Sequence, residues 1–400
     1  MGVIMKALQS YSYIRGFNHE PDFTTYTSEQ AERELGYAKR LGLNSCRLFM
    51  PIRFWKEDRE GFLTKLLEFV RIAHGYGIST TPILLMAYYT DNQKSDLMDD
   101  VQKTLIPGCY FKENYHISEK YVTDVVGLLK DEPGLLFWDL MNEPSYHDFI
   151  INITDEAEKS RRLEMVWEFV RHFIGIVRKL DPVNALGVGH TFIDDTEASK
   201  TGELVDILIF HDYLETRSRV EATCKRALEL SEKYSKPVIN NEMGCLCRAN
   251  PYDAVIEIHD NYNIGWYIFK LMIEGSWQGA HGICYADGTV RDPSIAAAIL
   301  GFFRNRDETA VFPDINGEGH VEKAIAFTRE VLAHKASAEE LLEAAEYIVN
   351  LLECGELIPM AYPPSAKIAA YRRQKNPNIP ELRAWLYSLV ETIREACQLV

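Results

Sequence analysis

Residues 134–144 read GLLFWDLMNEP, a short apolar run that ends in an amide, a carboxylate and a proline. Large aliphatic and aromatic side chains crowd the first half of this run, which is typical of a strand inside a sheet. In barrels of parallel strands, functional groups gather where the strands end. Because Asn142 and Glu143 end this run, the residues that end the other strands are also candidates for functional groups.

Seven further apolar runs predict strands, at residues 11–18, 44–50, 78–87, 184–190, 205–212, 237–242 and 264–271. Longer amphipathic stretches between these runs predict helices, at residues 28–41, 61–75, 119–130, 158–180 and 219–234. Alternating strands and helices imply parallel strands that are joined by right-handed crossovers. Eight such units favour an α/β fold of the closed (β/α)8, or TIM, barrel type over an open sheet.

The pattern changes after about residue 305, where strands disappear. Helical stretches are predicted at 320–335, 337–354 and 380–398, and Ser337 with Glu340 forms a capping-box pattern. We therefore predict a catalytic barrel over residues 1–305 and a helical C-terminal extension over residues 306–400. The extension is either an appendage packed on the barrel or a surface for homo-oligomer formation.

Charge and composition exclude several classes of partner. The chain has 43 lysines and arginines against 59 aspartates and glutamates, a net charge of −16, which repels nucleic acid and anionic membranes. No run approaches the roughly 20 apolar residues that a membrane span requires. Eight scattered cysteines and an N-terminus without a secretion-signal pattern favour the cytoplasm over a trimmed secreted protein.

The predicted strands end on residues that can carry chemistry. Two of the ends hold a carboxylate that follows an asparagine, namely Glu143 after strand 134–142 and Glu242 in strand 237–242. The other polar residues at strand ends are Asn18, His19, Arg47, His211 and Tyr213. Two glutamates that stand three strands apart face one another across the mouth of a barrel.

Two facing carboxylates fit glycoside hydrolysis. One group must donate a proton to the leaving oxygen, and the other must be ionised to attack the anomeric carbon or to stabilise the positive charge that develops there. Most single glutamates in loops are simply solvated. That explanation does not account for two apolar strands that each end in Asn-Glu.

The chain resembles the glycoside hydrolases of clan A, closest to family 5 and its cellulase-like members. Residues 137–144 (FWDLMNEP) are similar to the clan's strand-4 motif, residues 237–244 (PVINNEMG) to its strand-7 motif, and residues 211–213 (HDY) to the His-x-Tyr after strand 6. Arg47 matches the arginine of strand 2. The resemblance covers residues from about 11 to 303.

This resemblance assigns roles to residues. Glu143 becomes the general acid/base and Glu242 the nucleophile, in a two-step reaction that retains the anomeric configuration, with carboxyl groups roughly 5 Å apart. Arg47 keeps the nucleophile ionised. The resemblance implies no metal and no other cofactor. Substrate contacts are then expected from Asn18, His19, Asn142, His211 and Tyr213.

An aromatic sugar platform is expected at the end of strand 8. Trp266 and Phe269 are the two candidates, and Trp277 in the following loop is a third stacking face. Other aromatic residues near strand ends are candidates for further sugar contacts: Trp55, Tyr88, Tyr89 and Tyr146. Any one of them is equally well explained as a core residue.

Two other functions are left open. The chain could be a carbohydrate-binding relative without catalysis, or a barrel enzyme of different chemistry, such as an aldolase or a metal hydrolase. No strand ends on a Schiff-base lysine, and no metal-ligand spacing is present. The sugar is undetermined among gluco-, manno- and galacto-configured β-glycosides. The sequence leaves endo action on oligo- or polysaccharides and exo action on small glycosides both open; exo action is favoured if the long segment from Asp91 to Ser118 closes one end of the cleft.

Overall fold

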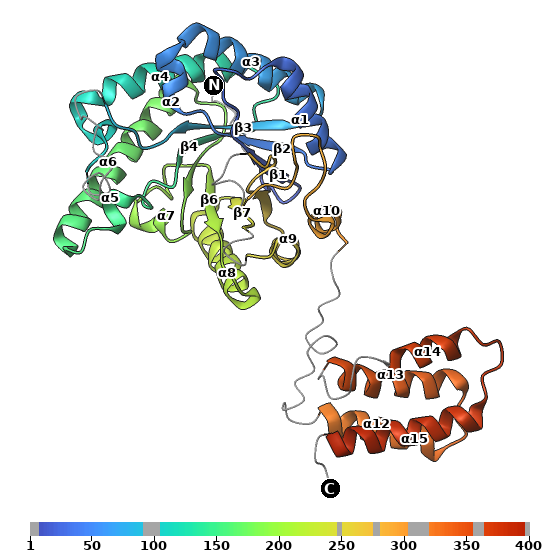
Figure 1. Ribbon diagram of the computed structural model, residues 1–400. Coiled ribbons are helices and arrows are strands. Elements are labelled where there is room, and N and C mark those ends of the chain that lie inside the picture. The colour runs from blue at the N-terminus through green and yellow to red at the C-terminus, as the bar shows by residue number, and fades with distance from the viewer. Residues whose placement is uncertain are drawn as a thin grey trace. The chain divides into compact units, whose positions relative to one another are not determined.

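The computed structural model describes residues 8–90, 105–245, 250–274, 281–302, 320–354 and 364–396. The chain divides into two compact units, Met1–Phe303 and Arg304–Val400, and each is described by itself (Figure 1). Within the described ranges no helix is both long and apolar enough to cross a membrane.

The first unit contains a closed barrel of eight parallel strands in chain order, β1 to β8. This confirms the predicted (β/α)8 fold. Each of the eight predicted runs overlaps one strand. The strands are β1 Arg15–His19, β2 Ser45–Leu48, β3 Ser79–Leu85, β4 Trp138–Asn142, β5 Leu186–His190, β6 Ile207–Asp212, β7 Val238–Met243 and β8 Gly265–Ile268.

Helices surround the strands of this unit (Figure 1). The five predicted helices are present as α1 Ser28–Arg40, α3 Arg59–Gly75, α4 Tyr115–Leu129, α6 Glu156–Leu180 and α8 Arg217–Tyr234. The remaining helical segments were not predicted: α2 Ile52–Glu57, η2 Gly108–Tyr110, η3 Lys112–Asn114, α5 Asp148–Ile151, α7 Asp195–Ala198, α9 Tyr252–Asn261 and α10 Pro293–Ile299. Most of these are too short to show a helical period.

The interior of the barrel is layered. Apolar side chains fill the half nearest the start of the strands, and this cluster consists of Tyr11, Ile14, Phe137, Ala185, Ile207, Ile209, Ile239 and Tyr267. Farther along the same strands the interior turns polar, with Asn18, Arg47 and Asp139 fully buried. An apolar plug below a polar layer places the functional groups at the carboxyl ends of the strands, as barrels of this type require.

The second unit is a helical bundle with its own apolar core, which is built around residues such as Leu341, Ile348 and Leu386. Its helices are α12 His320–Ala333, α13 Ala338–Cys354, α14 Pro364–Arg372 and α15 Ile379–Ala396. The predicted capping box is confirmed, because the Glu340 backbone N–H donates to Ser337 Oγ at 3.3 Å and Ser337 N–H donates to Glu340 Oε2 at 2.8 Å.

Helix α14 was not predicted from the sequence. Pro364 is instead the first residue of α14. A proline fits that position well, since the backbone N–H it lacks would have no partner in the first turn of the helix. Self-association through this unit stays a prediction.

Candidate active site

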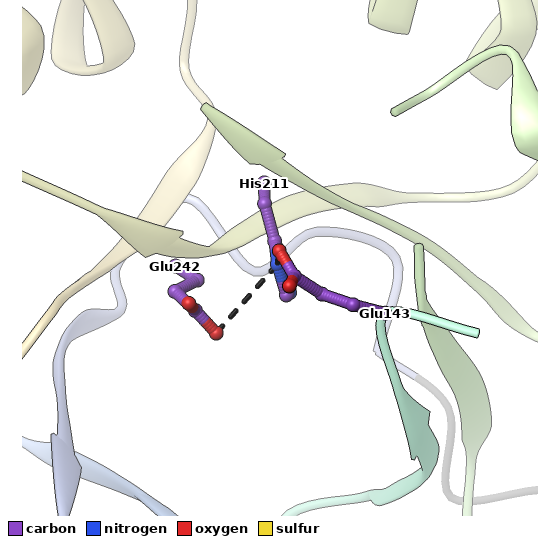
Figure 2. A group of neighbouring side chains, drawn as sticks. All are labelled: Glu143, His211 and Glu242. Atoms are coloured by element: carbon purple, nitrogen blue, oxygen red, sulfur yellow. Dashed lines mark hydrogen bonds and ion pairs between the residues drawn. The ribbon is translucent and has the colours of Figure 1, made fainter. Parts of the chain in front are cut away.

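Two carboxylates from opposite sides of the barrel meet at its mouth. Glu143 follows β4 directly, and Glu242 lies near the end of β7. One carboxylate oxygen of each residue and a ring nitrogen of His211 all lie within 4.8 Å of one another (Figure 2). The structure thus brings together the two glutamates that the sequence singled out.

The backbone at Glu143 has an unusual conformation. Its φ angle is +42°, in the left-handed region that residues other than glycine rarely adopt. The N–H of Glu143 still donates to the carbonyl oxygen of Gly189 in β5, at 2.8 Å. The residue is therefore held at the end of the strand while its side chain is turned toward Glu242. Backbone strain of this kind concentrates at functional sites.

Arg47 lies beneath the two carboxylates and connects them to the barrel. Its guanidinium is fully buried; Nη1 donates to Glu242 Oε2 at 2.7 Å, and Nε donates to Asp139 Oδ2 at 2.8 Å. Burial lowers the pKa of Arg47, but the adjacent carboxylates of Asp139 and Glu242 more than offset this, so its pKa is raised. Arg47 therefore places a permanent positive charge against the Glu242 carboxyl group.

The same guanidinium fixes two asparagines. Nη1 also donates to Asn18 Oδ1 at 3.0 Å, and Nη2 donates to Asn142 Oδ1 at 2.8 Å. Asn142 is partly exposed and so presents its amide at the mouth. Asn18 is fully buried, and its Nδ2 donates to the carbonyl oxygens of Asn241 and Ile268. Asn18 therefore supports Arg47 and does not reach a substrate.

The other oxygen of Glu242 accepts a hydrogen bond from Tyr213 Oη at 2.8 Å. Burial and the nearby carboxylates of Glu242 and Glu143 raise the pKa of Tyr213 well above its usual value. The phenol therefore stays protonated and remains a donor. With Arg47 on one oxygen and Tyr213 on the other, the Glu242 carboxylate is fixed in orientation.

His211 stands between the two glutamates. Its Nδ1 lies 2.8 Å from Glu143 Oε1 and 3.6 Å from Glu242 Oε2, and its side chain is buried (Figure 2). This hydrogen bond between His211 Nδ1 and Glu143 orients the acid/base candidate, as Tyr213 orients Glu242.

Two residues of the site were not predicted. Asp139, in the middle of β4, accepts hydrogen bonds from Arg47, from Asn241 Nδ2 at 2.8 Å and from the Gly189 N–H at 2.9 Å. Both Asp139 and Asn241 are fully buried. A charged residue inside an otherwise apolar strand was the signal for Asp139, because a buried aspartate requires a cationic partner.

Gly189 provides the space for the pair formed by Arg47 and Asp139. A Cβ atom at this position would lie 2.9 Å from Asp139 Oδ2 and 3.0 Å from Arg47 Nη2. We therefore expect Gly189→Ala to destabilise the barrel by about 1–3 kcal/mol and to lower activity, because the ion pair must shift. Thermal unfolding of the purified variant measures the change in stability.

A matched glycine provides the control for this prediction. Gly175 in α6 is exposed, and a Cβ there would meet nothing within 4 Å. Gly175→Ala should therefore raise stability by roughly 0.5–1 kcal/mol through its helix propensity. Equal effects of the two substitutions would contradict the packing argument for Gly189.

Two further predicted substrate contacts are wrong, and a third lies outside the described residues. His19 lies outside the barrel wall, where its Nε2 is 2.9 Å from Tyr26 Oη and 3.2 Å from Glu34 Oε2, so it does not reach the mouth. Trp266 is fully buried, and its Nε1 donates to Asp260 at 3.0 Å on the helix side. Trp277 lies outside the described residues.

A cavity of about 700 Å³ opens over the carboxylates. At one end it is lined by Glu242, Tyr213, Phe269 and His281. Phe269 is therefore the strand-8 aromatic residue that faces the site, in place of Trp266. Of the other aromatic candidates, Tyr146 lines the cavity, whereas Trp55 is buried against α4.

The other end of the cavity extends past Glu143 to the rim over β5, β6 and α8. There Tyr146 and Phe192 form an edge-to-face pair with ring centroids 6.1 Å apart, and both side chains are about half exposed. Asp212, Arg219 and Arg226 line the same end. Of these rim residues, only Tyr146 was among the sugar contacts predicted from the sequence.

Asp212 is a buried carboxylate with an altered acidity. Only 2% of the residue is exposed, and burial raises its pKa to about 6, although the Leu214 N–H and the charge of Arg219 lower it. Glu215 adds a smaller raising effect. A raised folded-state pKa means that ionisation of Asp212 opposes folding.

Replacement of Asp212 by asparagine tests this effect of pH. Between about pH 4 and pH 6 the folded wild type binds more protons at this site than the unfolded chain, so the wild type loses stability as the pH rises. The Asp212→Asn variant has no carboxyl group to ionise at this position, so it does not lose stability in this way as the pH rises. The difference in unfolding free energy should grow in favour of the variant by up to about 3 kcal/mol from pH 4 to pH 7. A difference that does not change with pH would contradict the buried, ionising carboxyl.

Comparisons with known proteins agree with the fold. No protein-family model and no curated protein sequence matches the chain. Among solved structures, an endo-1,4-β-mannanase from Rhizomucor miehei superimposes with a TM-score of 0.56 at 16% identity, covering 72% of this chain and 93% of that one.

Two further structures extend the comparison. A subfamily-18 member of glycoside hydrolase family 5 from Streptomyces cattleya, in complex with Manβ1-4GlcNAc, has a TM-score of 0.55 at 15% identity and covers 83% of this chain and 95% of that one. An exo-β-1,4-mannosidase from Opitutaceae bacterium strain TAV5 has a TM-score of 0.54 at 14% identity and covers 86% and 71%. At such identities the likeness shows the barrel fold, in agreement with the predicted resemblance.

Proposed function

We propose that this chain is a glycoside hydrolase of family 5 that cleaves β-linked, gluco- or manno-configured glycosides with retention of configuration. The observation that carries the proposal is the pair Glu143 and Glu242 beside a cavity, with one carboxylate oxygen of each residue within 4.8 Å of the other. Retaining enzymes have carboxyl groups about 5–5.5 Å apart, whereas inverting enzymes separate them by about 6.5–9.5 Å to admit a water molecule.

The contacts of the two glutamates support different roles for them. Glu242 accepts hydrogen bonds from Arg47 and Tyr213, which orient its carboxyl group for attack on the anomeric carbon. Glu143 lies 2.8 Å from the Nδ1 atom of His211 and lines the cavity, where a glycosidic oxygen can approach it. We therefore assign Glu242 as the nucleophile and Glu143 as the general acid/base.

The reaction then proceeds in two steps. In the first, the Glu242 carboxylate forms a bond to the anomeric carbon while Glu143 transfers its proton to the departing glycosidic oxygen. In the second, Glu143 removes a proton from water, which attacks the anomeric carbon and releases Glu242. Each step inverts that carbon, so the product keeps the β configuration. Asn142, held by Arg47, is placed to contact the sugar 2-hydroxyl during both steps.

The glycosyl unit to test first is mannose. The names of the three solved structures above refer to a mannanase, a mannosidase and a mannose-containing disaccharide. We propose action on short oligosaccharides or simple glycosides, with endo action on polysaccharides as the alternative. Part of the long segment from Asp91 to Ser118, on which this preference depends, lies outside the described residues.

A metal site is the main chemical alternative, because Glu143, His211 and Glu242 are also groups that can ligate a cation. The arrangement favours glycosidase chemistry, since Arg47 and Tyr213 already occupy the oxygens of Glu242 and a cation would face the charge of the arginine. We expect dialysis against EDTA to leave β-glycosidase activity unchanged. Activity that is lost with EDTA and restored by a divalent metal would contradict this assignment.

The direct test is a panel of aryl β-glycosides followed by proton NMR of the product. We expect hydrolysis of at least one gluco- or manno-configured substrate, with the β anomer formed first and the α anomer appearing only by mutarotation. An α anomer formed first would contradict the two-step mechanism. No hydrolysis of any substrate would favour a carbohydrate-binding protein without catalysis.

A further inference from the structure

The acid/base candidate lies in a turn with a strained backbone. Glu143 has a φ angle of +42°, and the Tyr146 N–H donates to its carbonyl oxygen at 3.1 Å, which closes the turn formed by residues 143–146. A residue other than glycine stays in this region of backbone space only where the surrounding structure holds it. The position of the Glu143 carboxyl group therefore depends on the contacts that hold this turn.

The turn is attached to the segment that follows β5 at two points. At its start, the Glu143 N–H donates to the carbonyl oxygen of Gly189 at 2.8 Å. Two residues later, Ser145 Oγ donates to Asp195 Oδ2 at 2.6 Å, and Thr191 Oγ1 lies 3.5 Å from the same hydroxyl oxygen. A hydrogen bond to a carboxylate is shorter and stronger than one between neutral groups. Ser145 and Asp195 thus connect the turn to α7.

Asp195 is the first residue of α7, and α7 is itself attached to the end of β5. The Nε2 atom of His190 lies 2.9 Å from Thr201 Oγ1, and Ser199 Oγ lies 2.8 Å from the same oxygen. These three residues are at most 2% exposed. The Ser199 N–H in turn donates to the carbonyl oxygen of Asp195 at 2.9 Å. The carboxylate that Ser145 contacts therefore belongs to a segment that buried hydrogen bonds hold in place.

Ser145 and Asp195 do not themselves contact a substrate. Both are partly buried, and neither is among the residues that line the cavity over the carboxylates. An effect of either residue on catalysis must therefore act through Glu143. His211 orients the Glu143 carboxyl group at 2.8 Å, but it can do so only while the backbone of the turn keeps that group within reach.

We propose that Ser145 and Asp195 are positioning residues for the general acid/base, and that their hydrogen bond holds the turn 143–146 so that the Glu143 carboxyl group reaches the glycosidic oxygen. This inference rests on the proposed function, because it requires Glu143 to protonate a leaving group. Without the hydrogen bond the turn can relax, and a shift of about 1 Å in a catalytic group can cost about 10²-fold in rate. The loss should be largest for the leaving groups that most need a proton.

The test compares two substrates that carry the same glycosyl unit, chosen as the one hydrolysed fastest in the aryl glycoside panel. The leaving group of a 2,4-dinitrophenyl β-glycoside departs without a proton, whereas that of a phenyl β-glycoside needs one, because phenolate is far more basic. Each leaving group is a single aromatic ring, so the two make similar demands on space. The measured quantity is the ratio of kcat/KM for the phenyl glycoside to kcat/KM for the dinitrophenyl glycoside, which does not depend on the fraction of active protein.

Ser145→Ala is the first variant, because it removes the hydroxyl that donates to Asp195. We expect the ratio to fall by about 10- to 100-fold, while kcat/KM for the dinitrophenyl glycoside changes little. Ser145→Thr keeps a hydroxyl and should bring the ratio back close to the wild-type value. Ser160→Ala, at an exposed position of α6 that does not line the cavity, is the control and should leave the ratio unchanged.

Asp195→Ala tests the other side of the hydrogen bond and carries the test if Ser145→Ala does not fold. We expect the same fall in the ratio. The double variant Ser145→Ala/Asp195→Ala should fall no further than either single variant, because the same hydrogen bond is lost in all three. A ratio that stays constant in the soluble single variants would overturn the positioning role.

The double variant also separates the hydrogen bond from an effect of charge. Burial, and to a smaller extent the charges of Asp194 and Glu143, raise the pKa of Asp195, so the carboxyl groups of Asp195 and Glu143 also interact through space. If Asp195 acted on Glu143 through its charge alone, the two substitutions would act independently. A fall in the double variant equal to the product of the two single falls would therefore overturn the hydrogen-bonded pair. Failure of the wild type to hydrolyse either aryl glycoside would instead overturn the proposed function itself.

Discussion

Glu242→Ala is expected to lower kcat/KM by at least roughly 10⁴-fold on every β-glycoside that the wild type cleaves, because the variant lacks the group that attacks the anomeric carbon. The loss should not depend on the leaving group, since neither good nor poor leaving groups depart without a nucleophile. Steady-state kinetics on activated aryl glycosides measure it. Glu232→Ala, an exposed glutamate of α8, is the matched control and should retain activity.

A small external nucleophile makes the prediction for Glu242 more specific. The side chain removed in Glu242→Ala leaves space on the α face of the sugar, where azide can attack while Glu143 still donates its proton. We expect azide to restore turnover of activated substrates and to give the α-glycosyl azide. Full activity of Glu242→Ala without azide would exclude Glu242 as the nucleophile.

Glu143→Ala is expected to act differently, because its cost depends on how much help the leaving group needs. For a disaccharide, whose leaving alkoxide is strongly basic, loss of the general acid should lower kcat/KM by about 10²–10⁴-fold. For an aryl glycoside with a good leaving group the first step should be affected far less, so that the glycosyl-enzyme accumulates. A series of aryl glycosides with leaving groups of increasing basicity measures this dependence.

Azide also distinguishes the two glutamates. In Glu143→Ala it attacks the glycosyl-enzyme from the β face, in place of the water molecule that Glu143 activates, so the product should be the β-glycosyl azide. An equal loss for good and poor leaving groups, or an α-glycosyl azide from this variant, would contradict the assignment of Glu143 as the acid/base.

The barrel was predictable because the same pattern, a short apolar run typical of a strand, recurs eight times along the chain. Each of the eight apolar runs overlaps a strand, and parallel strands bring their carboxyl ends to one mouth. This rule alone placed Glu143, Glu242 and Arg47 together, although they are far apart in the sequence. Helix α9 was missed because its AVIEI core reads equally well as a strand.

Side-chain direction was predictable only where alternation holds. Asn18 points into the barrel, so the next residue, His19, must point outward, and the prediction that both contact substrate violated this rule. In β8 every position is apolar, so the sequence could not show that Tyr267 faces inward and Trp266 outward.

The alternation of inward- and outward-facing side chains also fails in the active site itself. Asn241 and Glu242 are consecutive, yet the first binds Asp139 inside the barrel and the second binds Arg47. A register shift between β7 and its neighbours allows this, and no residue pattern announces such a shift. The positive φ angle of Glu143 likewise breaks the alternation of side chains at the end of β4, and no residue pattern predicts it.

The measurement that tests the central claim most directly is the capture of the covalent intermediate. A 2-deoxy-2-fluoro-β-glycosyl fluoride of the preferred sugar should react with the wild type and remain attached, because the 2-fluoro group slows both steps whereas the good leaving group accelerates only the first. Mass spectrometry of the intact chain should show one added glycosyl unit, and peptide mapping should place it on Glu242. Attachment to any other residue, or turnover of the reagent by an active enzyme to an α product without attachment, would contradict a retaining mechanism through Glu242.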